Sequence, residues 1–140
     1  MREILFRGKQ KYNGEWYEGA SIFAENIAFI LHDAMIEFVS GFNENKLNFV
    51  LQEVIPETVG QYTGLTDKNG KKIFEGDILD CGDRVVFVKW HSYCGTWDSI
   101  FIKYSGERCS NGITPAEWKY RAVIIGNIHD NPELLKGGAE

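Results

Sequence analysis

The side chains best suited to metal chemistry lie in segment 91–94 (HSYC), which places an imidazole and a thiol three positions apart. Together with Cys81 and Cys109, His91 and Cys94 could supply the nitrogen and sulfur ligands that Zn²⁺ prefers. Structural zinc sites usually present such ligands as short pairs, and this sequence has one tight pair and no C-x-x-C. We therefore expect no metal or other cofactor, and three free thiols in a reducing compartment.

The same His91 and Cys94 could also act as a base and a nucleophile. That chemistry requires a thiolate held near an imidazole that a third group orients. The neighbouring Gly95 and Trp97 are typical of a turn and of a core strand. The sequence has no P-loop, Rossmann glycine pattern, G-x-S-x-G or H-E-x-x-H motif. It therefore predicts no catalytic residue and no enzyme, and a small hydrolase or metalloenzyme is the least favoured class.

Five carboxylates stand within seventeen positions of the chain: Asp67, Glu75, Asp77, Asp80 and Asp83. Paired carboxylates can perform acid–base chemistry or hold Mg²⁺. Each of these, however, flanks a glycine or a turn, where such side chains accept backbone N–H bonds. The pattern favours a structural role for them.

Lysines gather at a predicted hairpin, at positions 68, 71 and 72, with Tyr62 and Phe74 on its arms. A basic β-ribbon with aromatic residues could bind single-stranded nucleic acid through phosphate contacts and base stacking. Solvated lysines at a hairpin tip are the ordinary alternative, and they deter edge-to-edge pairing. The net charge of −5 counts against a general grip on phosphate backbones. Nucleic-acid binding through Lys68–Lys72 is therefore the alternative and not the preferred function.

Four tryptophans and six tyrosines are the other residues of the chain that could form a binding surface. In a small barrel, aromatic residues fill the interior or line a peptide-binding groove. Val86, Val88 and Trp90 alternate onto one face of a strand, so we expect Trp90 to lie in the core, whereas the position of Trp97 stays open. The candidate binding residues are thus Tyr62, Lys68, Lys71, Lys72 and Trp97.

Short strands separated by turns dominate the pattern. Asn-Gly pairs at 13–14, 69–70 and 111–112 favour tight hairpins, and we expect a type I′ turn at Asn69-Gly70. In the first part, two strands are expected within 4–19, and further ones at 21–24, 27–31, 35–39 and 47–54. The segment 27–39 could instead be a helix, because some of its apolar residues have helical spacing.

In the second part the hairpin arms are Tyr62–Thr66 and Lys72–Phe74, and the later strands are Ile78–Cys81, Val85–Trp90, Trp97–Tyr104 and Arg121–Gly126. Short helices are expected at Thr114–Glu117, from a capping box with proline at the first helical position, and at Asn131–Leu135. The fold class is mostly β. A β-rich segment (1–60) precedes a small barrel (61–140), with a boundary near Ile55–Gly60.

Three blocks of the sequence lie in the same order as in a known family. They are MREILFRGK at the start, QYTGLTDKNGKKIFEGDILD at 61–80 and VIIGNIHDNPELL near the end. Over nearly its whole length the chain resembles the YopX family of phage and prophage proteins. The resemblance implies an SH3-type barrel in the second part and a phage or prophage setting, but no activity. Because it includes Gly76-Asp77, we expect Asp77 to fix a corner of the chain.

These features favour a non-enzymatic binding module in the cytoplasm of a bacterial host. Its partner is expected to be a protein, which could be a second copy of the chain, since short strands leave open edges. No membrane partner is expected, because the apolar run Ile27–Leu31 is too short to cross a bilayer.

Overall fold

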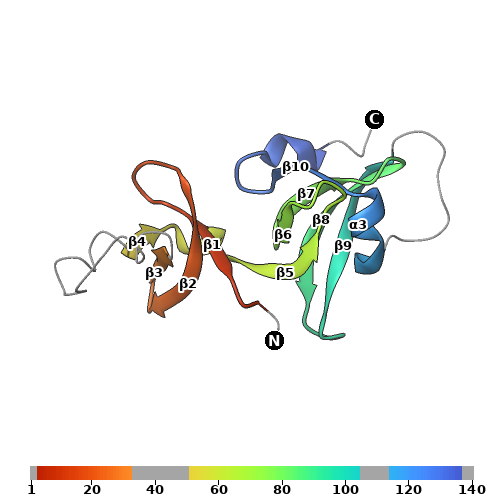
Figure 1. Cartoon of the computed structure of the whole chain (residues 1–140). Helices are drawn as coiled ribbons and strands as arrows, with labels where there is room; N and C mark the ends of the chain where they lie inside the picture. Colours follow the sequence, from red (N-terminus) through yellow and green to blue (C-terminus); the bar gives the residue numbers. More distant parts are fainter. Residues whose placement is uncertain (1–2, 33–50, 105–113, 137–140) are drawn as a thin grey trace. The chain divides into compact units, whose positions relative to one another are not determined.

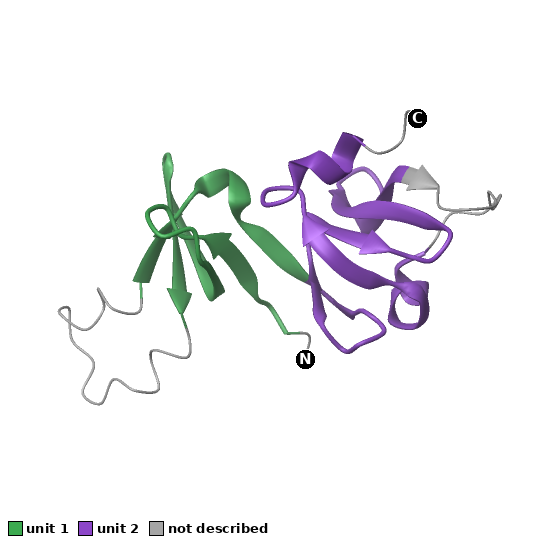
Figure 2. Ribbon diagram, turned by 90° about the horizontal axis from the view of Figure 1, so that it is seen from above, with its two compact units in different colours: residues 1–62 green, residues 63–140 purple. Residues whose placement is uncertain are grey.

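The computed structural model describes residues 3–32, 51–104 and 114–136 of the chain. It divides into two compact units, Met1–Tyr62 and Thr63–Glu140, which Figure 2 shows in green and purple. The sequence placed this division between residues 60 and 61. Strand β5 (Gly60–Thr66) carries the chain from one unit into the next. Each unit is described below by itself.

The first unit is an antiparallel sheet in the order β4-β3-β2-β1-β5 (Figure 1). The strands are β1 (Phe6–Lys9), β2 (Trp16–Ala24), β3 (Ile27–His32) and β4 (Leu51–Val54), followed by the short helix η1 (Pro56–Thr58). Because β3 is a strand, the helical alternative is wrong for residues 27–32. The strand expected at 35–39 lies outside the described residues, as does the first half of the one expected at 47–54.

The core of this unit is a small apolar cluster on one face of the sheet. Ala28, Ile30 and Val54 are its buried members. Gly19 lies in the central strand β2 opposite His32, and a Cβ there would overlap the Leu31 carbonyl oxygen. Glycine therefore lets β2 and β3 approach closely enough to cover this core.

The second unit contains a four-stranded antiparallel sheet in the order β10-β7-β8-β9, with β6 beside β5. Its elements are β6 (Lys72–Phe74), β7 (Asp77–Asp80), β8 (Arg84–His91), β9 (Thr96–Tyr104), η2 (Pro115–Glu117), α3 (Trp118–Arg121), β10 (Val123–Asn127) and η3 (Pro132–Lys136). The expected mostly β fold class is confirmed. Closure of an SH3-type barrel stays a prediction, since the described pairings form open sheets.

Both faces of this sheet are packed, because neighbouring residues of a strand point to opposite sides. Leu79 and Val86 belong to a cluster that Trp118 completes, whereas Ile78 and Val85 belong to a second cluster. The second cluster also includes Ile102, and Phe87, Ile128 and Leu134 pack against it.

The two short helices form where the sequence predicts them. The Glu117 carboxylate accepts hydrogen bonds from the Thr114 N–H (3.3 Å) and the Thr114 hydroxyl (3.2 Å), and Pro115 begins the helix. The chain then continues as one α-helical turn that places Trp118 in the core, where its Nε1 donates to Ser99 Oγ (3.2 Å). None of the helices in the described ranges is long and apolar enough to span a membrane.

Candidate functional site

Three of the five candidate binding residues meet on the hairpin between β5 and β6. Lys68 and Lys71 are exposed at its tip and Lys72 is half-buried on its second arm. Tyr62 is instead buried, and its N–H donates to the Leu5 carbonyl (2.7 Å). As folded, the Tyr62 ring offers no face to a stacked base.

The turn of this hairpin differs from the expected type I′. That type needs a positive φ at both central residues, and among the described residues only glycines and Glu25 have one. The Gly70 N–H donates to the Asp67 carbonyl (3.0 Å), the Asp67 N–H donates to the Lys71 carbonyl (2.9 Å), and Gly70 has a φ of +80°. These bonds describe a three-residue loop with a left-handed glycine at its end.

The Asp67 side chain explains why the loop is not a type I′ turn. It is only 2% exposed, and its Oδ1 accepts from the N–H groups of Asn69 (2.9 Å) and Lys71 (3.0 Å). Its Oδ2 accepts from the Ile124 N–H (3.2 Å), and the Lys68 N–H donates to the Ala122 carbonyl (3.0 Å). The hairpin tip is therefore held against the segment that links α3 to β10.

The other turn carboxylates also hold the backbone. Asp77 is buried and its Oδ2 accepts from the Phe74 N–H (2.8 Å), which fixes the corner at Gly76. Asp80 Oδ1 accepts from the Gly82 N–H (2.9 Å). No group of three His, Cys, Asp or Glu residues within the described ranges could hold a metal ion. These contacts match the structural role that the sequence favours for Asp77.

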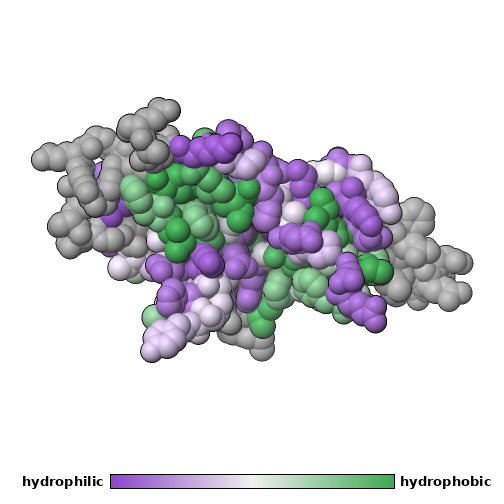
Figure 3. All heavy atoms as spheres, turned by 180° about the vertical axis from the view of Figure 1, so that it is seen from behind, coloured by the Kyte–Doolittle hydropathy of each residue, from purple (hydrophilic) through white to green (hydrophobic). Residues whose placement is uncertain are grey.

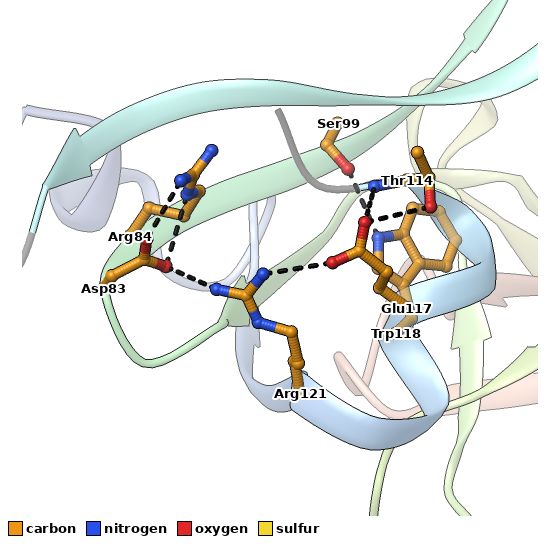
Figure 4. A network of polar contacts seen from close by, with 7 residues as sticks. All are labelled: Asp83, Arg84, Ser99, Thr114, Glu117, Trp118 and Arg121. Carbon is orange, nitrogen blue, oxygen red and sulfur yellow. Dashed lines mark hydrogen bonds and ion pairs between the residues drawn. The ribbon is translucent and has the colours of Figure 1, made fainter. Parts of the chain in front are cut away.

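Asp83 belongs to an ion-pair network that joins the link before β8 to α3 (Figure 4). Arg84 donates to both its oxygens (3.2 and 2.9 Å), and Arg121 donates to Asp83 (2.9 Å) and to Glu117 (3.0 Å). The Arg121 hydrogen bond, followed by that of the Thr114 N–H, lowers the pKa of Glu117. Each acid of this network is thus engaged by a cation of the same unit.

The His91–Cys94 pair makes a turn contact. The Cys94 N–H donates to His91 Nδ1 (3.1 Å), so a neutral ring carries its proton on Nε2. While this bond persists, Nδ1 cannot act as a base toward the Cys94 thiol. Burial raises the pKa of Cys81 to about 11, which keeps this thiol protonated and inert at neutral pH. Cys109 lies outside the described residues.

The expectation that Trp90 is a core residue is wrong, because its side chain is 42% exposed. Its ring lies 5.0 Å from that of its cross-strand partner Trp97, at an interplanar angle of 73°, and Trp97 packs against the core. Strand alternation places Trp90 on the same face as the buried Val88. The β8–β9 hairpin, however, runs beyond the core at this point.

An open hollow of about 250 Å³ lies beside this exposed end. Its lining residues are Lys89, Trp90, His91, Ser92, Tyr93, Asp98 and Ile100. Tyr93 is 95% exposed in the turn. We call Trp90, Tyr93 and Trp97 the aromatic end of the hairpin.

The sequence reasoning named Trp97 as a candidate but did not single out Tyr93, Lys89 or Asp98. One signal could have identified Tyr93: an aromatic residue one position before Cys94-Gly95 lies in a turn, where no core covers it. Lys89 and Asp98 are opposite each other in the register of the β8–β9 hairpin.

Comparison with known proteins identifies a family and a fold. The family model described as "YopX protein" matches residues 5–136. The crystal structure of protein EF1440 from Enterococcus faecalis is similar, with a TM-score of 0.57 at 24% identity over 96% of this chain and 99% of that one. At this identity the likeness shows the fold alone. No curated protein matches the chain.

Proposed function

The chain belongs to the YopX family, and from this premise we propose that it is a non-enzymatic binding module for a protein partner. The observation that carries the proposal is the aromatic end of the β8–β9 hairpin. Trp90 and Tyr93 are exposed next to a hollow of about 250 Å³. Tryptophan and tyrosine dominate the residues that contribute most to protein–protein binding, because they offer large contact areas with a polar tip.

The environment of the aromatic end supports a protein ligand. The hollow is lined by apolar Ile100 and by both Lys89 and Asp98. Such a mixture suits a side chain of a protein, which brings apolar and polar atoms together. Trp97, anchored on the core, fixes the position of Trp90, so the surface exists before a partner arrives.

A non-enzymatic role is supported by what the reactive groups already do. His91 Nδ1 accepts a backbone N–H, the Asp67 and Asp77 carboxylates hold turns, and Cys81 is buried as a thiol. Family membership supports a phage or prophage setting and, with it, action in the cytoplasm of a bacterial host.

A second copy of the chain is the other protein partner that we propose. In the first unit, Ile22 pairs with Phe29 and Ala24 pairs with Ile27, on the face opposite the core residues Ala28 and Ile30. Ile22 and Ile27 are exposed there, so this sheet has apolar residues on both faces; Figure 3 shows apolar patches on the surface of the chain. A homo-oligomer that covered Ile22 and Ile27 would remove their apolar surface from water.

Light scattering at micromolar concentration tests self-association. We expect a particle larger than 16.0 kDa, which Ile22→Lys reduces toward the mass of one chain. A clean 16.0 kDa particle for the unsubstituted protein would reject a homo-oligomer.

Comparative capture from a bacterial lysate tests the main proposal. The tagged full chain and its Tyr93→Ala and Trp90→Ala variants are the baits, with Tyr12→Ala as the control because Tyr12 is an exposed tyrosine of the first unit. We expect identified proteins that are retained by the control and lost at least about tenfold with either variant, which corresponds to about 1.4 kcal/mol. Equal capture by all four baits would contradict the proposal.

A further inference from the structure

Exposed lysines from two distant segments lie on neighbouring parts of the second unit. Lys68 and Lys71 belong to the hairpin tip, and Lys119 belongs to α3. The Lys68 N–H donates to the Ala122 carbonyl (3.0 Å), one residue after α3 ends. Asp67 Oδ2, which accepts from the Ile124 N–H, adds a second link. The hairpin tip is thus held next to the C-terminal end of α3.

The acids near these lysines are occupied elsewhere. Asp67 is buried and accepts three backbone N–H groups. Asp83 and Glu117 are paired with Arg121, and Asp83 also with Arg84. Among the described residues, none forms an ion pair with Lys68, Lys71 or Lys119. Arg84 and Arg121 balance Asp83 and Glu117, and the three lysines outnumber the remaining acid of this group, Asp67. The local charge is positive on a chain whose net charge is −5.

An exposed aromatic ring lies beside Lys119. Tyr120 is 75% exposed, and the Lys119 Nζ lies 5.9 Å from its ring centroid. The aromatic residues of the hairpin arms, Tyr62 and Phe74, are buried. Tyr120 thus supplies the accessible ring that the hairpin itself lacks.

We propose that Lys68, Lys71, Lys119 and Tyr120, which we call the basic surface, bind single-stranded nucleic acid. The three ammonium groups contact successive phosphates, and a base stacks on the Tyr120 ring. The Asp67 hydrogen bonds hold the hairpin in place, so little order has to be gained on binding. This surface is separate in residues from the aromatic end, so it does not depend on the protein partner.

Fluorescence anisotropy with a labelled oligothymidylate of about 15 nucleotides, long enough for one binding site, tests the proposal on the full chain. With three phosphates neutralised, the affinity should fall with salt at a log–log slope of about −2. Lys68→Glu combined with Lys71→Glu should weaken binding at least about tenfold. The substituted side chains leave the backbone N–H bonds of Lys68 and Lys71 in place, and an unchanged far-ultraviolet spectrum checks the fold.

Two control variants distinguish binding at the basic surface from a general effect of the protein's charge. Lys136→Glu removes an exposed lysine of η3 and should leave the affinity unchanged. Tyr120→Ser should weaken binding about tenfold at an unchanged salt slope, because it removes stacking and no charge. Three results would overturn the proposal: no binding at 0.1 mM protein in low salt, an equal loss with Lys136→Glu, or competition by polyglutamate as strong as by unlabelled oligonucleotide. The last would assign the surface to an acidic protein segment.

Discussion

The two compact units differ in how they use charged side chains. Among the described residues, all three buried charged ones lie in the second unit: Asp67, Asp77 and Arg84. Asp67 and Asp77 accept hydrogen bonds from backbone N–H groups, and Arg84 pairs with Asp83. The first unit is instead built from strand pairing over a small apolar cluster. The difference shows that residue types suited to catalysis can be required by the fold. Our proposal therefore places function on the surfaces that this framework displays.

The sequence blocks that carry the family resemblance also contain residues that the fold requires. The Ile128 N–H donates to the Gly76 carbonyl (2.9 Å), which connects the last block to the middle one. Asp67 and Ile124 connect the same two blocks a second time. A Cβ at Gly126 would overlap the Asn131 amide, whose oxygen accepts from the Asn127 N–H. The middle and last blocks therefore stabilise the second unit.

The largest expected effect comes from the side chain at the centre of that unit. Trp118→Ala should lower its free energy of unfolding by about 3–5 kcal/mol, because it leaves a cavity in the core. Hydrogen exchange of β7 and β8, read by mass spectrometry, would measure the loss separately from β2 and β3. The exposed neighbour Tyr120→Ala should change stability by less than about 0.5 kcal/mol. An equal loss in β2 and β3 would show that the units do not unfold separately.

Asp67→Ala is expected to have the next largest effect. It leaves three backbone N–H groups without their acceptor. Water can replace the carboxylate at the exposed residues Asn69 and Lys71, so the cost is about 1–3 kcal/mol and comes from the Ile124 N–H. Asp67→Asn retains one carbonyl oxygen and should cost clearly less. Urea denaturation followed by circular dichroism would rank the two variants. Equal stability of Asp67→Ala and the parent protein would refute the role assigned to this carboxylate.

Gly70→Val should destabilise the protein less, by about 1–2 kcal/mol, through backbone strain at a φ of +80°. Steric clashes add nothing to this loss of stability, since no heavy atom lies within 4 Å of a Cβ built at Gly70. Gly70→Asn is the matched control, because asparagine tolerates the left-handed conformation. Thermal melting of both variants is the measurement, and equal losses would mean that φ is not the cause.

The sequence predicted the elements better than the contacts between them. Strands β3 and β8 and the Thr114 capping box follow from local signals, namely β-branched residues, flanking turns and cap residues. Alternation identified the face of Trp90 but not where the core ends along the strand. At Asn69-Gly70, the dipeptide signal was overridden by the Asp67 side chain.

The candidate sites were predictable only in part. Trp97 and the hairpin lysines were named from the sequence, whereas the basic surface depends on a contact between Lys68 and Ala122 that no local pattern encodes. Asp67 and Ile124 are likewise 57 positions apart. Contacts of this range follow from packing of the whole unit.

Hydrogen–deuterium exchange of the full chain, alone and with a captured partner protein, tests the central claim most directly. We predict that the partner slows exchange at residues 89–98, which contain the aromatic end, and that Tyr93→Ala removes this protection. Unchanged exchange at 89–98, with protection confined to residues 20–28 of the first unit, would contradict the account and place the binding surface on the other unit.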